Sequence, residues 1–411
     1  MRRTLPCALV VWLLATTAVG ISQVATRQAD GGGLYDANPN HLWNRIHRHF
    51  FVRVRVGEEH GFDRVDPLLW TETLHLVAGP SHEKALALLD EFLMARGETL
   101  VADPLKRAVF QHDLWAVFDW VAGPYSIEPP RQALMTRLAQ VMRRVALTSG
   151  EIARLPDTYG AAIVSTGLPA LPRDFFGGSW VGVESRKPLV PQHASELSRS
   201  AFHVLWRVPG NETVAYLSRL WEFPQPFVPD PSFDLAGDRE LRVKLNPALP
   251  AVPDGTQVAL LRSMLLVGST GRVIPTRIVE TIQVRAFHSI QAFTEFTMSR
   301  AALFAGQDGG LRAVGRDERD FITFSSKGMD IFERNPTARG SGNPVLEMCS
   351  NCHSDFSARL ESIRSLPQLL KPHPYLSSGT DPTARWLAQA GVSAEANTRR
   401  ADWGALQALW R

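Results

Sequence analysis

The sequence predicts an α+β protein of several domains. Its 411 residues exceed the usual size of one domain, and a hydrophobic content of 45% is enough for more than one core. Apolar residues recur at helical spacing up to about residue 158, and short runs of β-branched and aromatic residues between Pro and Gly follow. We therefore expect a helical domain at 34–158, a mainly antiparallel β domain at 159–315 and a small helical domain at 316–411.

Helix boundaries in the first domain are marked by residues that favour helix termini. Asn and Pro precede an apolar pattern at 38–50, Ser81 precedes the next, and Asp103-Pro104 opens a third that closes at Gly123-Pro124. A fourth helix follows Pro129-Pro130. The third contains an aromatic run, from Gln111 to Trp120, whose apolar spacing is typical of a buried core helix.

Three runs in the middle domain predict strands, at 200–208, 257–267 and 277–287. Ser269-Thr270-Gly271 lies between the last two, which makes them a hairpin. The intervening segment 212–221 has helical spacing. The last part of the chain, from Thr383 to Arg411, is again helical in pattern.

The overall charge excludes one class of function. The formal net charge is +3, and two of the positive charges belong to Arg2 and Arg3 at the extreme N-terminus. A nucleic-acid-binding protein needs a one-sided basic field, which this balance does not provide. We therefore expect no nucleic-acid partner.

The N-terminus is typical of an export signal. Arg2 and Arg3 precede an apolar stretch at 5–21, and Ala18-Val19-Gly20 supplies the small residues that a signal peptidase recognises. We expect a signal peptide over residues 1–25 and a periplasmic or secreted bacterial protein. The alternative is an uncleaved membrane anchor, since the stretch approaches the length of a spanning helix, and a membrane contact is expected only in that case.

The cysteines are concentrated in one short motif. The chain has three, and Cys7 lies within the expected signal peptide, so the mature protein keeps Cys349 and Cys352 in the sequence Cys-Ser-Asn-Cys-His. Two thiols at positions i and i+3 can each form a thioether bond with a vinyl group of one porphyrin, and His353 is then placed beneath the iron as its proximal ligand. The motif predicts one covalently attached haem c.

Cys349, Cys352 and His353 resemble the haem-attachment motif of c-type cytochromes residue for residue. Upstream, Gly328 and Phe332 lie in a segment similar to the helix that precedes this motif in class I cytochromes c. The resemblance covers about 320–411, and no family resemblance is found for the preceding three quarters. It implies a cytochrome c-like domain at the C-terminus, electron transfer, and a redox partner protein whose identity it does not specify.

The two thiols have three alternative uses besides haem attachment. A redox-active Cys349–Cys352 pair would require a βαβ unit around it. The Pro/Gly-rich segment that precedes the motif, from Asn335 to Pro344, does not have the pattern of such a unit. A zinc site would need at least one further ligand, and no diagnostic Cys/His spacing supplies it. A simple disulfide loop is the remaining alternative. Haem attachment is the interpretation that also uses His353.

The sixth iron ligand departs from the usual pattern of class I cytochromes c. No methionine follows Met348, so the axial Met expected downstream is missing. His373, between Pro372 and Pro374, is one candidate for the distal ligand, and Met329 upstream or a distant His is another. An open distal position is the third alternative. Bis-His ligation would lower the reduction potential, whereas an open position would permit peroxide chemistry.

No catalytic residues are recognised outside the haem motif. Seven histidines lie between His41 and His112, but without the spacing of a known metal motif, and we expect them to be structural. Electron transfer is therefore the leading function, and an enzyme is the less favoured interpretation. The two alternatives are a peroxidase-like haem enzyme with an open distal site and a partner-binding protein with an accessory haem.

Overall fold

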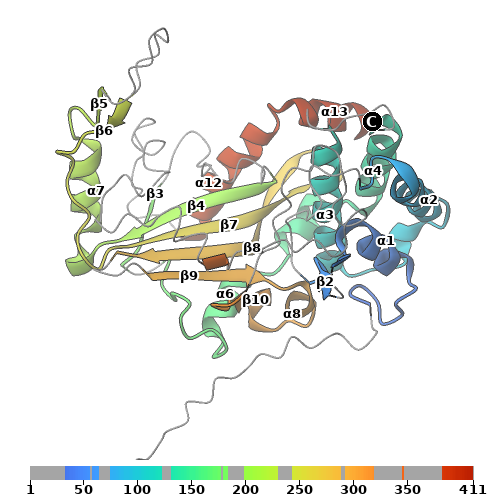
Figure 1. The fold of residues 1–411 in the computed structure, drawn as a ribbon, viewed down its shortest axis with the longest axis horizontal. Helices are drawn as coiled ribbons and strands as arrows, with labels where there is room; N and C mark the ends of the chain where they lie inside the picture. The colour runs from blue at the N-terminus through green and yellow to red at the C-terminus, as the bar shows by residue number, and fades with distance from the viewer. Residues whose placement is uncertain are drawn as a thin grey trace, which may run out of the picture.

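The computed structural model describes residues 33–55, 58–63, 75–122, 131–176, 179–183, 199–229, 243–287, 292–318, 345–346 and 382–410. Within these ranges the chain is an α+β protein built on an antiparallel sheet (Figure 1), which confirms the predicted fold class at that level. Helices gather at one end of the sheet, and the last two helices of the chain lead from the sheet to this helical end.

Four helices form the helical end of the molecule, and all four were predicted. Their boundaries lie within a few residues of the expected ones: α1 is Leu42–Phe51, α2 is Gly79–Met94, α3 is Pro104–Ala122 and α4 is Arg131–Val145. A short hairpin of β1 (Arg53–Arg55) and β2 (Glu58–His60) follows α1. Helix α2 begins earlier than expected, because Ala78 takes the cap position, while the Ser81 hydroxyl donates to the Ala78 carbonyl.

Helix α3 is buried on nearly every side, as its aromatic run predicted. Apolar side chains such as Val109, Trp115 and Phe118 are almost inaccessible to solvent, but so are Gln111 and His112. A helix without a polar face lies in the interior of a protein. Helix α3 therefore occupies the junction where the helical end meets the sheet, and its polar residues must find partners there.

The main sheet has six antiparallel strands in the order β10-β9-β8-β7-β4-β3. The hairpin predicted around Ser269-Thr270-Gly271 is confirmed, since β7 and β8 pair on either side of it and Gly271 has a positive φ of 75°. The strands are β3 (Val181–Val183), β4 (Ser200–Arg207), β7 (Gln257–Val267), β8 (Val273–Ala286), β9 (Ala292–Met298) and β10 (Leu311–Ala313).

Short elements connect these parts. The helix predicted at 212–221 is confirmed as α7 (Thr213–Trp221). The remaining short elements are the helices α5 (Ser149–Ala153), α6 (Thr158–Val164) and α8 (Arg300–Phe304), the strand pair β5 (Phe227–Pro229) and β6 (Val243–Leu245), and the 3-10 turns η1 (Gly97–Thr99), η3 (Pro209–Asn211) and η5 (Asp308–Gly310).

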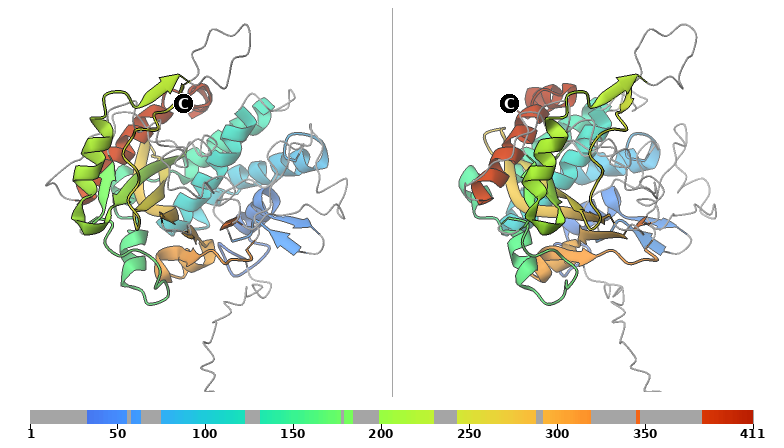
Figure 2. Two further views of the ribbon diagram at one scale, coloured as in Figure 1. Left: turned by 60° about the vertical axis from the view of Figure 1, so that its left-hand side comes forward. Right: turned by 90° about the vertical axis from the view of Figure 1, so that its left-hand side faces the viewer.

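The C-terminal helical pattern is confirmed by α12 (Pro382–Asn397) and α13 (Ala401–Trp410). Helix α12 packs on strands β4 and β8, and α13 packs on α3 and α4. Figure 2 shows both helices, in red, lying against the rest of the fold. The three tryptophans of these helices are all buried: Trp386, Trp403 and Trp410.

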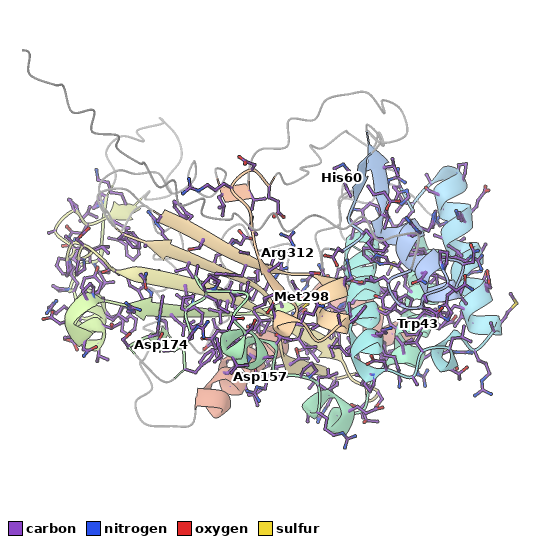
Figure 3. All side chains as sticks on the ribbon, turned by 90° about the horizontal axis from the view of Figure 1, so that it is seen from below. Trp43, His60, Asp157, Asp174, Met298 and Arg312 are labelled. Carbon is purple, nitrogen blue, oxygen red and sulfur yellow. The ribbon has the colours of Figure 1, made fainter. Side chains whose placement is uncertain are left out.

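The apolar cores combine segments that are distant in the sequence. The core of the helical end includes Leu265 of β7 and Trp403 of α13, and the core on one face of the sheet includes Val109 of α3 and Trp386 of α12. A third core joins β4 to α7 at the far end. Figure 3 shows Trp43 at the helical end and Asp174 beside the sheet, with Met298 between them. Among the described residues, cores therefore run across residue 158 and include the last two helices.

Candidate functional site

The residues predicted to hold the haem lie outside the part of the chain that the structure describes. These are the covalent attachment residues and their axial partners: Cys349, Cys352, His353, His373 and Met329. The described residues that lie nearest to the Cys349–His353 motif are Val345 and Leu346 before it, and the described chain resumes at Pro382 after it. The structure therefore shows how the chain is anchored before and after the motif.

The upstream anchor is a backbone contact next to the sheet edge. The amide of Val345 donates to the carbonyl of Glu318 at 2.9 Å, and the Val345 side chain is buried. Glu318 in turn accepts two hydrogen bonds of 2.7 Å from the guanidinium of Arg312 on β10. Bidentate pairing of this kind is geometrically specific. The chain is thus held to the edge of the main sheet just before the motif.

The downstream anchor is an aromatic stack between α12 and β4. The ring of Trp386 lies on the ring of His203, with centroids 3.9 Å apart and planes 21° apart. The Trp386 indole N–H points to the carbonyl of Thr276 at 3.4 Å, and His203 Nε2 lies 3.3 Å from Ser263 Oγ. Burial lowers the pKa of His203 to about 3, so its ring is neutral at neutral pH. Within the described ranges His203 belongs to no group of side chains that could hold a metal ion, and its stack with Trp386 and its contact with Ser263 indicate a structural role.

A buried ionic cluster links α3 to the sheet. The carboxylate of Glu280 lies 2.7 Å from His112 Nε2 and 3.0 Å from Arg262 Nε, and it accepts a 2.6 Å hydrogen bond from the Ser200 hydroxyl. We call these four residues the Glu280 cluster. On the other side of the ring, His112 Nδ1 lies 3.1 Å from the carbonyl of Leu265.

A bulge in the sheet places Glu280 in this cluster. The pairing of β7 with β8 passes from Arg262–Thr281 to Ser263–Val279, so Glu280 is the additional residue of strand β8. Burial alone would raise the pKa of Glu280. The charges of Arg262 and His112, together with hydrogen bonds from His112 and Ser200, outweigh that effect and lower the pKa to about 2. Glu280 is therefore ionised at neutral pH.

The geometry of the Glu280 cluster indicates a structural role. A hydroxyl nucleophile is activated by an imidazole that accepts its proton. Here the Ser200 hydroxyl donates to the Glu280 carboxylate, and the His112 ring contacts that carboxylate and a backbone carbonyl. All four side chains are buried. Buried ion pairs of this kind join elements inside a protein, and removal of one member leaves an uncompensated buried charge.

Two further buried ion pairs hold the same helix. Asp113 Oδ1 lies 2.7 Å from the guanidinium of Arg300 on α8, and the Arg300 side chain is fully buried. The Tyr35 hydroxyl donates to Asp113 Oδ2 at 3.4 Å. Near the end of α3, Asp119 lies 3.1 Å from Arg199, which precedes β4. The charged residues of α3 thus connect it to the N-terminal segment, the sheet and α8, and sequence periodicity alone did not predict these connections.

The N-terminal histidines contact backbone carbonyls. His47 Nε2 lies 2.9 Å from the Phe62 carbonyl, His49 Nε2 2.8 Å from that of Ser81, and His75 Nε2 3.1 Å from that of His49, while His82 Nδ1 lies 2.7 Å from that of Leu76. Carbonyl partners fix the orientation and tautomer of each ring. Within the described ranges, His, Cys, Asp and Glu side chains form no group of three that could hold a metal ion.

Comparison of the chain with protein-family models, with curated protein sequences and with solved structures found no match. Of the helices that the structure describes, none combines the length and the apolar character needed to cross a membrane.

Proposed function

We propose that this chain is an exported c-type cytochrome that carries one covalent haem and transfers electrons. The observation that carries the proposal is the spacing of Cys349, Cys352 and His353. Two thioether bonds and a proximal imidazole from five consecutive residues are the chemistry that this spacing serves. When bound, the haem supplies a one-electron couple at its iron, and His353 would hold the iron from the proximal side.

The distribution of cysteines supports this use of the thiols. Cys7 belongs to the expected signal peptide over residues 1–25, so the mature chain would keep only the two motif cysteines. An exported protein that is stabilised by disulfides distributes its cysteines along the chain. Export itself fits the proposal, because c-type haem is attached outside the cytoplasmic membrane. We place the protein in the bacterial periplasm or outside the cell.

The anchoring contacts support a haem carried on a folded body. The motif lies between Val345, which is held to Glu318, and Trp386, which is stacked on His203. We propose that residues 316–411 contain a small cytochrome c-like unit whose terminal helices pack on the body formed by 34–158 and 159–315. The redox partner would then approach the haem-bearing segment, while the body supplies a rigid support.

The distal iron ligand decides how the haem is used. His373 and Met329 are the two ligands proposed from this chain, and an open position is the alternative. The absence of a methionine after Met348 is the specific observation that favours an open position, and with it a peroxidase-like enzyme as the second candidate function. A six-coordinate low-spin spectrum that resists cyanide would support the electron carrier. A high-spin iron that binds cyanide would support the enzyme.

Haem attachment is tested by expressing the full chain, with its signal segment, in a bacterium that has a working cytochrome c maturation system. We expect the purified protein to give a pyridine haemochrome spectrum and an intact mass that exceeds that of the polypeptide by one haem. Cys349→Ser and Cys352→Ser should each remove one thioether bond and lower the yield of haem protein. Cys7→Ser is the matched control and should leave haem attachment unchanged.

Two results would contradict the proposal. One is a mature protein without a haem adduct from cells that load a known c-type cytochrome in parallel. The other is equal haem content in the wild type and in the double variant Cys349→Ser/Cys352→Ser, which would show that any haem is bound without the motif. The distal ligand is examined separately with His373→Ala and Met329→Leu, because only loss of the true ligand changes the low-spin spectrum.

A further inference from the structure

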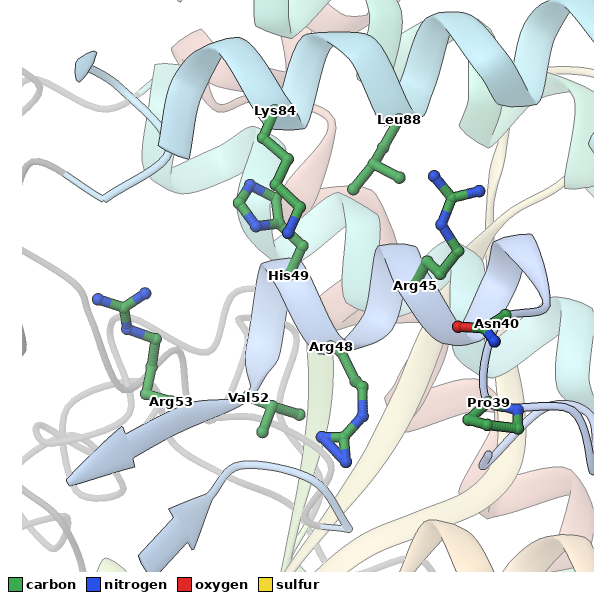
Figure 4. Close-up of a pocket in the computed structure, with 9 residues that line it drawn as sticks. All are labelled: Pro39, Asn40, Arg45, Arg48, His49, Val52, Arg53, Lys84 and Leu88. Carbon is green, nitrogen blue, oxygen red and sulfur yellow. The ribbon is translucent and has the colours of Figure 1, made fainter. Parts of the chain in front are cut away.

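A basic pocket of about 350 Å³ lies between helices α1 and α2. Figure 4 shows Lys84 of α2 reaching toward His49 of α1, with Arg45 further along α1 and Arg53 on β1. Arg48 completes the set of nitrogen-bearing side chains, and the lining residues include no carboxylate. A pocket of this size can hold a small molecule.

Four cationic side chains line the pocket, and two of them are paired with carboxylates beside it. Arg45 forms two hydrogen bonds with Glu91, of 2.6 and 2.9 Å, and Arg48 lies 2.7 Å from Glu59. These pairs are nearly half exposed, so each neutralises a charge without closing the pocket. Lys84 has no ion-pair partner in the part of the chain that the structure describes. The local charge is therefore positive, and it is concentrated beside His49.

His49 is sensitive to this positive charge. Its Nε2 lies 2.8 Å from the Ser81 carbonyl and so carries the proton, which leaves Nδ1 as the acceptor nitrogen. Burial lowers the pKa of His49, and the charges of Lys84 and Arg53 lower it further. An added anion would oppose these charges.

We propose that this pocket binds a small oxyanion, a carboxylate or a phosphate- or sulfate-type group, through Lys84 and the neighbouring guanidinium groups. Arginine and lysine are the side chains that recognise such groups, Arg through its planar fork and Lys as a point charge. Val52 and Leu88 give the pocket apolar walls, which suits an anion with a short carbon skeleton. The inference is independent of haem binding.

Anion binding should be coupled to protonation of His49. An anion beside Lys84 offsets the charges that lower the pKa of His49, so the pKa rises in the complex and binding takes up a proton. Sulfate is the suitable probe, because it does not itself titrate near neutral pH. Its affinity should be greater at about pH 6 than at about pH 8, and it should fall as salt is added.

The test is isothermal titration of the purified full-length protein with sulfate and, separately, with succinate at constant ionic strength. We expect Lys84→Gln to weaken binding about three- to five-fold, the usual effect of one partly exposed charge pair. Lys84→Arg should retain most of it. Arg219→Gln is the matched control, because Arg219 lies on α7 at the opposite end of the molecule (Figure 1).

Two readouts decide the outcome. If sulfate binds more tightly than succinate, the preferred ligand is a tetrahedral oxyanion, and if succinate binds more tightly, it is a dicarboxylate. Either result supports the proposed site, provided that Lys84→Gln weakens the binding. Absence of binding by both probes would overturn the proposal. So would equal weakening by Lys84→Gln and Arg219→Gln, since the anions would then be general counterions. The imidazole resonances of His49, followed by NMR, should show a higher pKa in saturating sulfate than in chloride.

Discussion

The imidazole Nε2 of His112 lies 2.7 Å from the carboxylate Oε1 of Glu280, and both side chains are 1% exposed. His112 belongs to the central helix of the helical end, and Glu280 to the bulge of strand β8. The pair therefore joins the two halves of the fold through a charge contact in the interior. Because the interior screens charges weakly, the contact depends on every member of the Glu280 cluster being present.

Glu280→Gln should destabilise the protein strongly. The substitution keeps the shape of the side chain but leaves Arg262 and His112 buried beside a neutral amide, which costs about 3–5 kcal/mol of unfolding free energy. The measurement is urea denaturation followed by circular dichroism. Glu222→Gln at the exposed end of α7 is the control and should change stability by less than about 0.5 kcal/mol. Similar midpoints for the two variants would contradict a stabilising role for the cluster.

His203 should make the protein less stable as the pH falls below neutral. Its pKa is lowered from 6.5 to about 3 in the folded protein, so the unfolded chain binds a proton first and stability is lost between those values. His203→Phe keeps the stack with Trp386 and removes the titration. Between those two pH values, the unfolding free energy of the variant should fall by up to about 1.4 kcal/mol less per pH unit than that of the wild type.

The control for this prediction is Ser263→Ala, which removes the hydroxyl partner of His203 but keeps the titrating ring. Its pH dependence should follow the wild type. Unfolding free energies are measured from urea curves at a series of pH values. An unchanged slope in His203→Phe would show that another buried group accounts for the loss of stability in acid.

Trp386→Ala should detach α12 from the sheet. The substitution removes the stack on His203 and an edge contact with Phe176, whose ring centroid lies 4.9 Å away. Loss of a buried Trp costs about 3–5 kcal/mol. Leu387→Ala, at a neighbouring position that is 38% exposed, should be almost neutral. Thermal unfolding distinguishes the two, and equal melting temperatures would contradict the proposed docking of α12.

Thr148→Ala should remove the side-chain N-cap of α5. The Thr148 hydroxyl accepts a hydrogen bond from the amide of Glu151, and the Glu151 side chain bonds back to the amide of Thr148, which is a complete capping box. We expect a loss of about 1 kcal/mol. Thr136→Ala within α4 is the control and should be neutral or slightly stabilising, because the Thr136 hydroxyl bonds back to the carbonyl of Gln132 and otherwise accepts only a long, exposed bond from the Gln132 side chain. Denaturant midpoints measure both.

The sequence predicted elements whose residues carry a strong local pattern. Strand β7 has the predicted limits of 257–267, and α3 begins at the Asp103-Pro104 signal, since a short run of strand-forming residues and a Pro each act over a few residues. The capping box at Thr148 was also readable in the sequence, but α5 was not predicted. The haem motif is local in the same way, and its assignment stays a prediction, as its residues lie outside the described part of the chain.

The sequence by itself thus determined the helical and strand periods, the hairpin at Gly271 and the chemistry expected of Cys349, Cys352 and His353. Only the tertiary structure decided that His112 meets Glu280, that His203 lies under Trp386 and that the cores continue across residue 158. The physical reason is that periodicity records which face of an element is apolar, whereas a buried charge or ring is paired by whichever distant element packs against it.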